Sequence, residues 1–231
     1  MAQTSGVVLN GQVGLLTSRQ FLAAKGAAYN VTNSTPGTAI AYANQTSFSA
    51  TANGLFIVSN NNAVGGANIY LDRLKLIQTA TAPTGTLVAR FEVFNETGIV
   101  AMTGNVATRT PVQLNTGAGF AQTTGAVVQS FAAGAGTVPA AVGTRRLQDI
   151  IALQCGVSVI HDEWVVDFGS DGTSPGTAGL TAARATDPAR ISAQGAAIVI
   201  APQTTSWINA WTLTGAANIP SYEFSLTYVE V

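Results

Sequence analysis

The stretch Tyr222–Val229, with the sequence YEFSLTYV, decides the fold class of this chain. Large aromatic and aliphatic residues alternate with polar ones along its length. The large set is Tyr222, Phe224, Leu226 and Tyr228, and the polar set is Glu223, Ser225 and Thr227. Because successive side chains of a β-strand point to opposite faces, this period of two predicts a strand with one face toward a hydrophobic core.

Short segments with strand character recur upstream, separated by turn residues. Asn53-Gly54, between two of these segments, is a two-residue turn of the kind that closes β-hairpins. Ile69–Thr79 has apolar residues at both parities, which predicts a strand covered partly on both faces. The predicted strands are Val31–Asn33, Thr38–Ala43, Ser47–Ala52, Leu55–Ser59, Ile69–Thr79, Thr86–Asn95, Val112–Leu114, Val127–Phe131, Leu147–Leu153, Val157–Phe168, Ala196–Ile200, Trp207–Leu213 and Tyr222–Val229.

The segments between these strands are rich in Gly, Ala and Thr. Gly104–Gly125, Ala132–Thr144 and Gly169–Gln194 are long for loops of a compact domain, although Arg184–Arg190 is compatible with one helical turn. No segment requires a long α-helix. The pattern predicts an all-β fold, an antiparallel two-sheet sandwich of jelly-roll type, which is the commonest eight-stranded version of that architecture.

The first 25 residues differ from the rest and predict an N-terminal arm. They begin with Gly- and Ser-containing sequence, and Leu15–Lys25 then forms either a short helix or an extended segment. The strand signals start after this arm. We therefore expect an arm over residues 1–25 and one sandwich domain over residues 26–231.

Charged residues are scarce in this chain. They make up 9% of its 231 residues, against roughly 25% in an ordinary soluble domain. Gly26–Leu71, Thr110–Thr144 and Ile191–Tyr222 contain none, yet these stretches are dominated by small and polar residues. Since catalysis depends on titratable groups, the composition favours a non-enzymatic protein whose surface is held against other protein.

The totals also exclude some partners. A net charge of −1 provides no basic field for nucleic acid, and no apolar run is long enough to span a membrane. Met1–Gly14 has neither a basic leader nor an apolar core, so we expect no secretory signal. Cys155 is the only cysteine, and its apolar neighbours indicate a buried side chain rather than a nucleophile.

Two short motifs contain residues that can bind an ion or act as acid and base. On a strand, His161 and Glu163 share a face, but there is no second His to complete a zinc site. Asp167 and Asp171 are spaced loosely like ligands of a calcium loop, but Ala178 stands where an EF-hand needs a bidentate Glu. We expect a polar strand surface or subunit contact at the first motif. An irregular calcium site at the second stays open. We predict no catalytic residues, no metal and no cofactor.

The remaining candidates are contact residues. Trp207 and Trp211 share a face on a strand, which is compatible with a sugar-stacking platform but more typical of core or interface tryptophans. Arg145 and Arg146 are cations in neutral surroundings, and we interpret them as salt-bridge or interface anchors. The predicted interface set is Leu15, Leu16, Phe21, Arg145, Arg146, Trp207 and Trp211.

The region from Val165 to the C-terminus resembles the end of the jelly-roll virion proteins of tailed phages. The residues that carry the resemblance are Asp167-Phe168-Gly169, Thr181–Arg190, Ile198–Gln203, Trp207–Trp211 and Tyr222–Glu230, with upstream strands at Ala52–Ser59, Ile69–Ile77 and Leu87–Asn95. The resemblance implies a capsid decoration (cement) protein, usually a homotrimer, made in the host cytoplasm and bound to the major capsid protein on the exterior of the head. It transfers no site residue, because the family has no catalytic motif to match.

Two other functions stay open at this point. The same fold serves in other virion components, such as a major capsid protein, a head fibre or a tail protein. A carbohydrate-binding sandwich that uses Trp207 and Trp211 belongs to a different class. The leading expectation is a capsid decoration protein whose arm clamps the shell or a neighbouring subunit.

Overall fold

The computed structural model of the chain describes residues 4–9, 12–33, 40–41, 54–80, 87–115, 117, 124–137, 140–155, 159–169, 190–212 and 221–231. These residues form one short helix and sixteen strands. The elements are β1 (Thr4–Leu9), β2 (Gln12–Thr17), α1 (Ser18–Ala24), β3 (Ala28–Thr32), β4 (Ile40–Ala41), β5 (Gly54–Asn60), β6 (Ile69–Ala80), β7 (Leu87–Thr97), β8 (Thr103–Arg109), β9 (Val112–Gln113), β10 (Ala126–Thr137), β11 (Arg145–Cys155), β12 (Glu163–Phe168), β13 (Arg190–Gly195), β14 (Val199–Ile200), β15 (Thr204–Thr212) and β16 (Ser221–Glu230).

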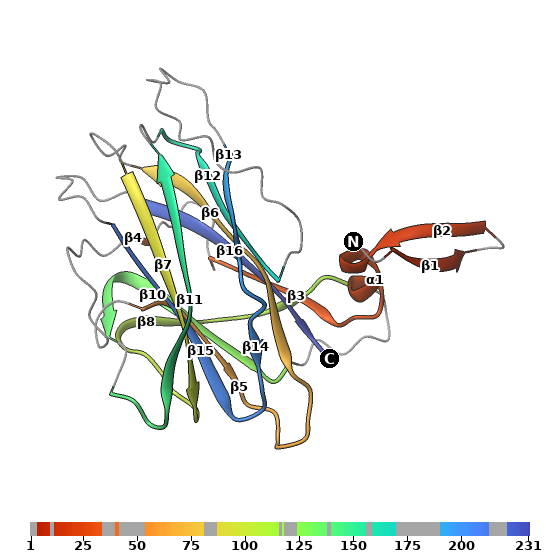
Figure 1. Cartoon of the computed structure of the whole chain (residues 1–231), viewed down its shortest axis with the longest axis horizontal. Coiled ribbons are helices and arrows are strands. Elements are labelled where there is room, and N and C mark those ends of the chain that lie inside the picture. Colours follow the sequence, from red (N-terminus) through yellow and green to blue (C-terminus); the bar gives the residue numbers. More distant parts are fainter. Residues whose placement is uncertain are drawn as a thin grey trace.

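Two large sheets pack face to face (Figure 1). The six-stranded sheet has the order β11-β7-β15-β5-β10-β8. The eight-stranded sheet has the order β13-β12-β6-β16-β3-β9, with β14 paired to β6 and β4 paired to β16. All described strand pairs in these sheets are antiparallel except the parallel pair of β12 and β13. The predicted all-β antiparallel sandwich is therefore confirmed, with one parallel edge pair.

The main strands pair in a nested order. β3 pairs with β16, β5 with β15, β6 with β12 and β7 with β11, all antiparallel. Along the chain, the first of these eight strands thus meets the last, the second meets the seventh, and so on inward. The strands β8, β9 and β10 form an insertion between β7 and β11. Such nesting is what results when one long antiparallel hairpin is rolled up.

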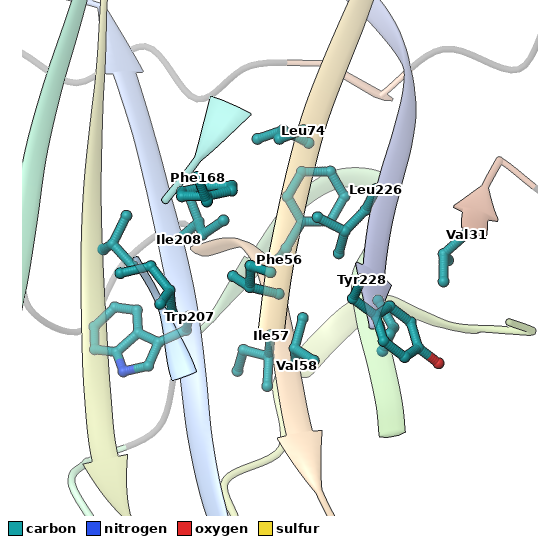
Figure 2. Packing of buried hydrophobic residues seen from close by; sticks show 14 of the residues in the cluster. Val31, Phe56, Ile57, Val58, Leu74, Phe168, Trp207, Ile208, Leu226 and Tyr228 are labelled. Atoms are coloured by element: carbon teal, nitrogen blue, oxygen red, sulfur yellow. The ribbon is translucent and has the colours of Figure 1, made fainter. Parts of the chain in front are cut away.

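The buried hydrophobic cluster fills the space between the two sheets and continues onto the outer face of the six-stranded sheet at Trp207 (Figure 2). Phe56 of β5 contacts Phe224 of β16 edge to face, with ring centroids 4.5 Å apart, and this contact joins the sheets. Burial of one such side chain contributes about 1.5–3 kcal/mol. The predicted alternation of β16 is confirmed, because its four large residues are buried and its three intervening polar residues are partly exposed.

A β-bulge explains the mixed pattern of Ile69–Thr79. Thr227 of β16 lies opposite Arg73 and Tyr228 lies opposite Leu71, so Asp72 is an extra residue in β6. The bulge reverses the parity of β6, which places Leu71 and Leu74 on the core side although they are three residues apart. The apolar positions therefore reflect a shift of register and not a strand with apolar cover on both faces.

Several predicted boundaries were wrong. Val157–Phe168 is not a single strand, because a turn with His161 at φ 73° precedes β12. β8 and β13 lie where loops were predicted, and their Gly-, Ala- and Ser-containing sequences carry little strand signal. The hairpin predicted around Asn53-Gly54 falls largely outside the described residues, as do Ser47–Ala52 and most of Arg184–Arg190.

The arm forms a hairpin of β1 and β2 followed by α1, and Figure 1 shows it beside the sandwich and outside both large sheets. The helix ends at Ala24, and Gly26 beyond it has a φ of 74°, which is unfavourable for residues with a side chain. Ala27 N–H donates to Leu22 O, and Gly26 N–H donates to Ala23 O, which is the Schellman pattern. The amide of Asn115 donates to Ala24 O at 3.0 Å and ties the base of the arm to the sandwich.

Candidate interaction surfaces

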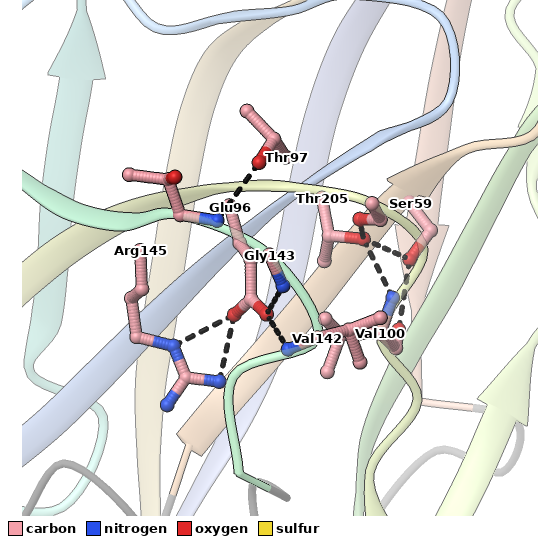
Figure 3. A network of polar contacts seen from close by, with 10 residues as sticks. Ser59, Glu96, Thr97, Val100, Val142, Gly143, Arg145 and Thr205 are labelled. Atoms are coloured by element: carbon pink, nitrogen blue, oxygen red, sulfur yellow. Dashed lines mark hydrogen bonds and ion pairs between the residues drawn. The ribbon is translucent and has the colours of Figure 1, made fainter.

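The chain itself covers part of the outer face of the six-stranded sheet. Val100 and Met102 are buried against it, in the segment that leads from β7 to β8. Thr205 Oγ1 accepts a hydrogen bond from Val100 N–H and donates to Gly98 O, both at 2.9 Å. Ser59 Oγ donates to Val100 O at 3.1 Å (Figure 3). Hydroxyl groups thus satisfy the hydrogen bonds of the backbone in the crossing segment, and they avoid the desolvation cost that charged groups would have.

The buried carboxylate of Glu96 holds a second segment, the loop before β11, on the outer face of this sheet. Glu96 is fully buried, and one of its oxygens accepts from Nε and Nη2 of Arg145, each at 2.7 Å (Figure 3). The other oxygen accepts from the N–H groups of Val142 and Gly143. A Cβ on Gly143 would lie 1.8 Å from Thr97 O, so this approach requires glycine. The carboxylate holds the loop before β11 against the sheet.

Trp207 is buried near this loop. Its ring stacks on Phe94 with centroids 4.5 Å apart, and the guanidinium of Arg145 lies 4.4 Å from its centroid. The side chain is fully buried, so it has no free face for a sugar or for another subunit. The burial of Trp207 within its own chain agrees with the core interpretation. The ion pair with Glu96 likewise agrees with the salt-bridge interpretation of Arg145.

The outer face of the eight-stranded sheet carries charged side chains that are partly exposed. Arg73 Nε lies 2.6 Å from an oxygen of Asp167, and Lys75 Nζ lies 3.8 Å from an oxygen of Glu163. These side chains are partly exposed, so each pair contributes at most about 1 kcal/mol. A shallow hollow of about 340 Å³ is lined by residues that include Thr32, Lys75 and Glu223. This surface suits solvent or a polar partner.

An apolar stripe crosses one end of this polar face. The register places Val229 of β16 between Ala28 of β3 and Tyr70 of β6, and Val199 of β14 lies opposite Tyr70. Leu114 N–H donates to Ala28 O at 2.9 Å, which continues the row beyond β9. We call this row of Leu114, Ala28, Val229, Tyr70 and Val199 the apolar stripe. Its middle is buried, but 47% of Leu114 and 38% each of Tyr70 and Val199 are exposed.

The acid–base and ion candidates that lie among the described residues are not gathered into one site. His161 is exposed in a turn and its backbone N–H donates to Gln78 O, so His161 and Glu163 do not share a strand face as predicted. Asp162 is fully buried and accepts from Val159 N–H at 2.9 Å. Asp167 pairs with Arg73, while Asp171 lies outside the described residues. Within the described part of the chain, no three His, Cys, Asp or Glu residues are grouped to hold a metal ion.

The other predicted contact residues are dispersed. Leu15 and Leu16 lie in β2 opposite Gly6 and Ser5, and Phe21 of α1 has Lys25 Nζ 5.7 Å from its ring centroid. Arg146 is exposed on β11. Trp211 lies in β15 opposite Arg90 of β7, and its side chain is outside the described residues. The arm residues are thus separated from Arg146, and the structure does not bring the predicted set together.

A polar cluster ties the end of β16 to two loops. Glu230 accepts from Asn62 Nδ2 at 2.8 Å and from Gly125 N–H at 2.9 Å. Tyr228 lies beside it, with its hydroxyl 3.0 Å from Thr124 Oγ1 and its ring stacked on Tyr29. Burial raises the pKa of Tyr228 above its usual value, so the hydroxyl is neutral here and serves as a structural hydrogen-bonding group.

Comparisons with protein-family models, with curated proteins and with solved structures each found no match for this chain. Among the described residues, no helix has the length and apolar character needed to cross a membrane. Sequence reasoning missed the apolar stripe. Tyr70 and Val199 were visible as apolar residues in strands, but only the register of five strands puts them in one row.

Proposed function

We propose that this chain is a non-enzymatic structural protein of a tailed-phage virion, a capsid decoration protein that binds the outer head surface as an oligomer, most simply a homotrimer. The observation that carries the proposal is the arm. An uncharged hairpin with six Val or Leu residues among its twelve strand positions lies outside a sandwich that has a complete core of its own. A segment of this kind gains stability by contacting another protein.

The strand order supports the fold on which this proposal rests. Nested pairing of eight strands from the outermost pair to the innermost is the arrangement of a jelly roll, with β8, β9 and β10 as an insertion. Jelly rolls are common in viral capsids, which is an analogy at the level of fold.

The burial of Trp207 removes support from the carbohydrate-binding alternative, because the proposed platform needs an exposed ring. A major capsid, head-fibre or tail role is compatible with the same fold. These roles differ from decoration in where the protein lies in the particle, so location decides among them.

The test is quantitative mass spectrometry of purified virions, followed by electron microscopy of the particles. We expect many copies per particle, in a fixed ratio to the major capsid protein, with density on the exterior of the head. Absence from the particle would refute a virion role, and density in the shell or tail would replace decoration by one of the other components.

Attachment is tested separately with heads that lack the protein. The purified full chain is expected to bind them to saturation, whereas a chain without Met1–Thr17 binds more weakly with its circular dichroism spectrum unchanged in the β region. Equal binding by both chains would remove the arm from the attachment mechanism.

A further inference from the structure

We propose that the apolar stripe is the docking site for the β1–β2 hairpin of a second copy of this chain. The inference rests on the self-association contained in the proposed function and names the surfaces that produce it. It concerns contacts between copies, and the arm then contributes to head binding through the oligomer that it closes.

The stripe is exposed at its two ends, at Leu114 and at Tyr70 and Val199, while Ala28 and Val229 in its middle are buried. The neighbouring row across the same sheet contains Asn30, Thr227, Arg73 and Asp167. In the stripe, by contrast, every position is apolar or aromatic, and Val112 beside it is 55% exposed. A contiguous apolar row rimmed by polar groups is typical of a protein–protein contact.

Among the described residues, the β1–β2 hairpin lacks a sheet of its own subunit to pack against. It forms a two-stranded sheet that is joined to neither large sheet, and Figure 1 shows it projecting from its own subunit. A two-stranded hairpin is only marginally stable in water by itself. The first charged residue of the chain is Arg19, so docking the hairpin on an apolar surface buries no ionised side chain.

The two surfaces agree in length. The stripe crosses β9, β3, β16, β6 and β14, and four spacings of about 4.8 Å give a length of about 19 Å. Each hairpin strand has six residues, which at about 3.3 Å per residue extend over about 17–20 Å. A hairpin laid across the strands of the sheet therefore covers the stripe from Leu114 to Val199.

Charge complementarity identifies the occupant as the arm of another copy. Arg19 and Lys25 are the only charged residues among the first 71, so the arm carries two positive charges and no negative one. The charged groups next to the stripe are Asp72, Arg73 and Asp167, with a sum of −1. Asp72, Arg73 and Leu114 line the same hollow of about 200 Å³ at the stripe, so an arm docked there meets charged groups of both signs beside apolar contact.

The base of the arm lies close to the stripe along the chain, so an exchanged arm has little distance to cross. The arm leaves its subunit at Gly26, two residues before Ala28 of the stripe. Two copies that exchange arms therefore bring both arm bases and both stripes together. Exchange of identical elements between copies is a low-cost route to closed oligomers, because each contact repeats one that the partner also makes.

The first experiment compares self-association by light scattering and sedimentation. The stripe variant carries Tyr70→Ser and Leu114→Ser, and the arm-deleted chain lacks Met1–Thr17. The matched control carries Leu147→Ser and Ile150→Ser on β11, where the two side chains are 48% and 47% exposed. We expect the stripe variant and the arm-deleted chain each to raise the dissociation constant at least about tenfold, while the control stays at the parent value.

The decisive experiment mixes the two defective chains. The arm-deleted chain keeps an intact stripe, and the stripe variant keeps an intact arm, so together they contain one complete contact. We expect them to assemble with each other although neither assembles alone. A mixture that behaves as the sum of its components overturns the proposal, as does a stripe variant that associates like the parent.

The remaining outcomes separate this inference from the proposed function. A full chain that is monomeric overturns exchange between copies. Faster hydrogen exchange at Tyr70 and Val199 after deletion of Met1–Thr17 would then show that the chain's own arm covers the stripe. If the stripe variant associates normally while the protein still decorates heads, only the docking site is wrong. If the exchange is observed but virions lack the protein, only the virion role is wrong.

Discussion

The two outer faces of the sandwich are built in opposite ways. On the six-stranded sheet, the chain covers its own strands, and the buried groups are hydroxyls, Trp207 and the Glu96–Arg145 pair. On the eight-stranded sheet, the outer face carries two partly exposed ion pairs, Arg73 with Asp167 and Lys75 with Glu163. The first face uses polar groups for contacts within the subunit, and the second keeps them available to the surroundings.

The comparison explains how a chain with few charges distributes them. A buried ion pair needs nearly ideal geometry to offset desolvation, and Glu96 meets this requirement with Arg145 and two backbone N–H groups. Exposed pairs need no such support, because water solvates them. We therefore expect equal chemical changes on the two faces to have very different effects on stability.

The largest effect is expected for Trp207→Ala. It removes the largest side chain buried on the self-covered face and leaves a cavity under Arg145, which costs about 3–5 kcal/mol of unfolding free energy. The matched change on the open face is Tyr70→Ala, for which we expect less than about 1 kcal/mol. Urea unfolding followed by circular dichroism measures both. Equal losses would show that the two faces do not differ as described.

Glu96→Gln is expected to cost about 3 kcal/mol, because it leaves the guanidinium of Arg145 buried without its countercharge. Hydrogen exchange should also become faster at Val142 and Gly143, whose N–H groups bond to this side chain. The double variant with Arg145→Met removes the unpaired charge, so it should be more stable than the single variant. A single variant as stable as the parent would mean that the carboxylate does not fasten the loop.

The contrast between the faces also shows what was predictable from sequence. The alternation of β16 depends only on neighbouring residues, so its core side was predicted correctly. The Glu96–Arg145 pair joins residues 49 positions apart and depends on the register of β7 with β11, which no local pattern specifies. Trp207 was ambiguous for the same reason, since a segment remote in sequence covers the face on which it lies.

Bulges and turns caused the other differences between the predicted strands and the strands of the structure. The extra residue at Asp72 reverses the parity of β6, and a period-two reading then suggests apolar cover on both faces. His161 adopts a left-handed backbone conformation that is rare for residues with a side chain, so a strand was predicted across a turn. The apolar stripe arises from strands that are distant in sequence, and it could be recognised only after the sheet order was known.

The smallest effect is expected on the open face, for Arg73→Gln. Its pair with Asp167 is short at 2.6 Å, but about a third of the arginine side chain is exposed, so we expect a loss below about 1 kcal/mol. Salt should diminish this loss further, because exposed charges are screened at high ionic strength, whereas the loss from Glu96→Gln should change little. Urea unfolding of both variants at low and high salt measures this difference directly. A loss from Arg73→Gln that is large and independent of salt would mean that water does not reach this face, and the contrast between an open and a self-covered sheet would have to be abandoned.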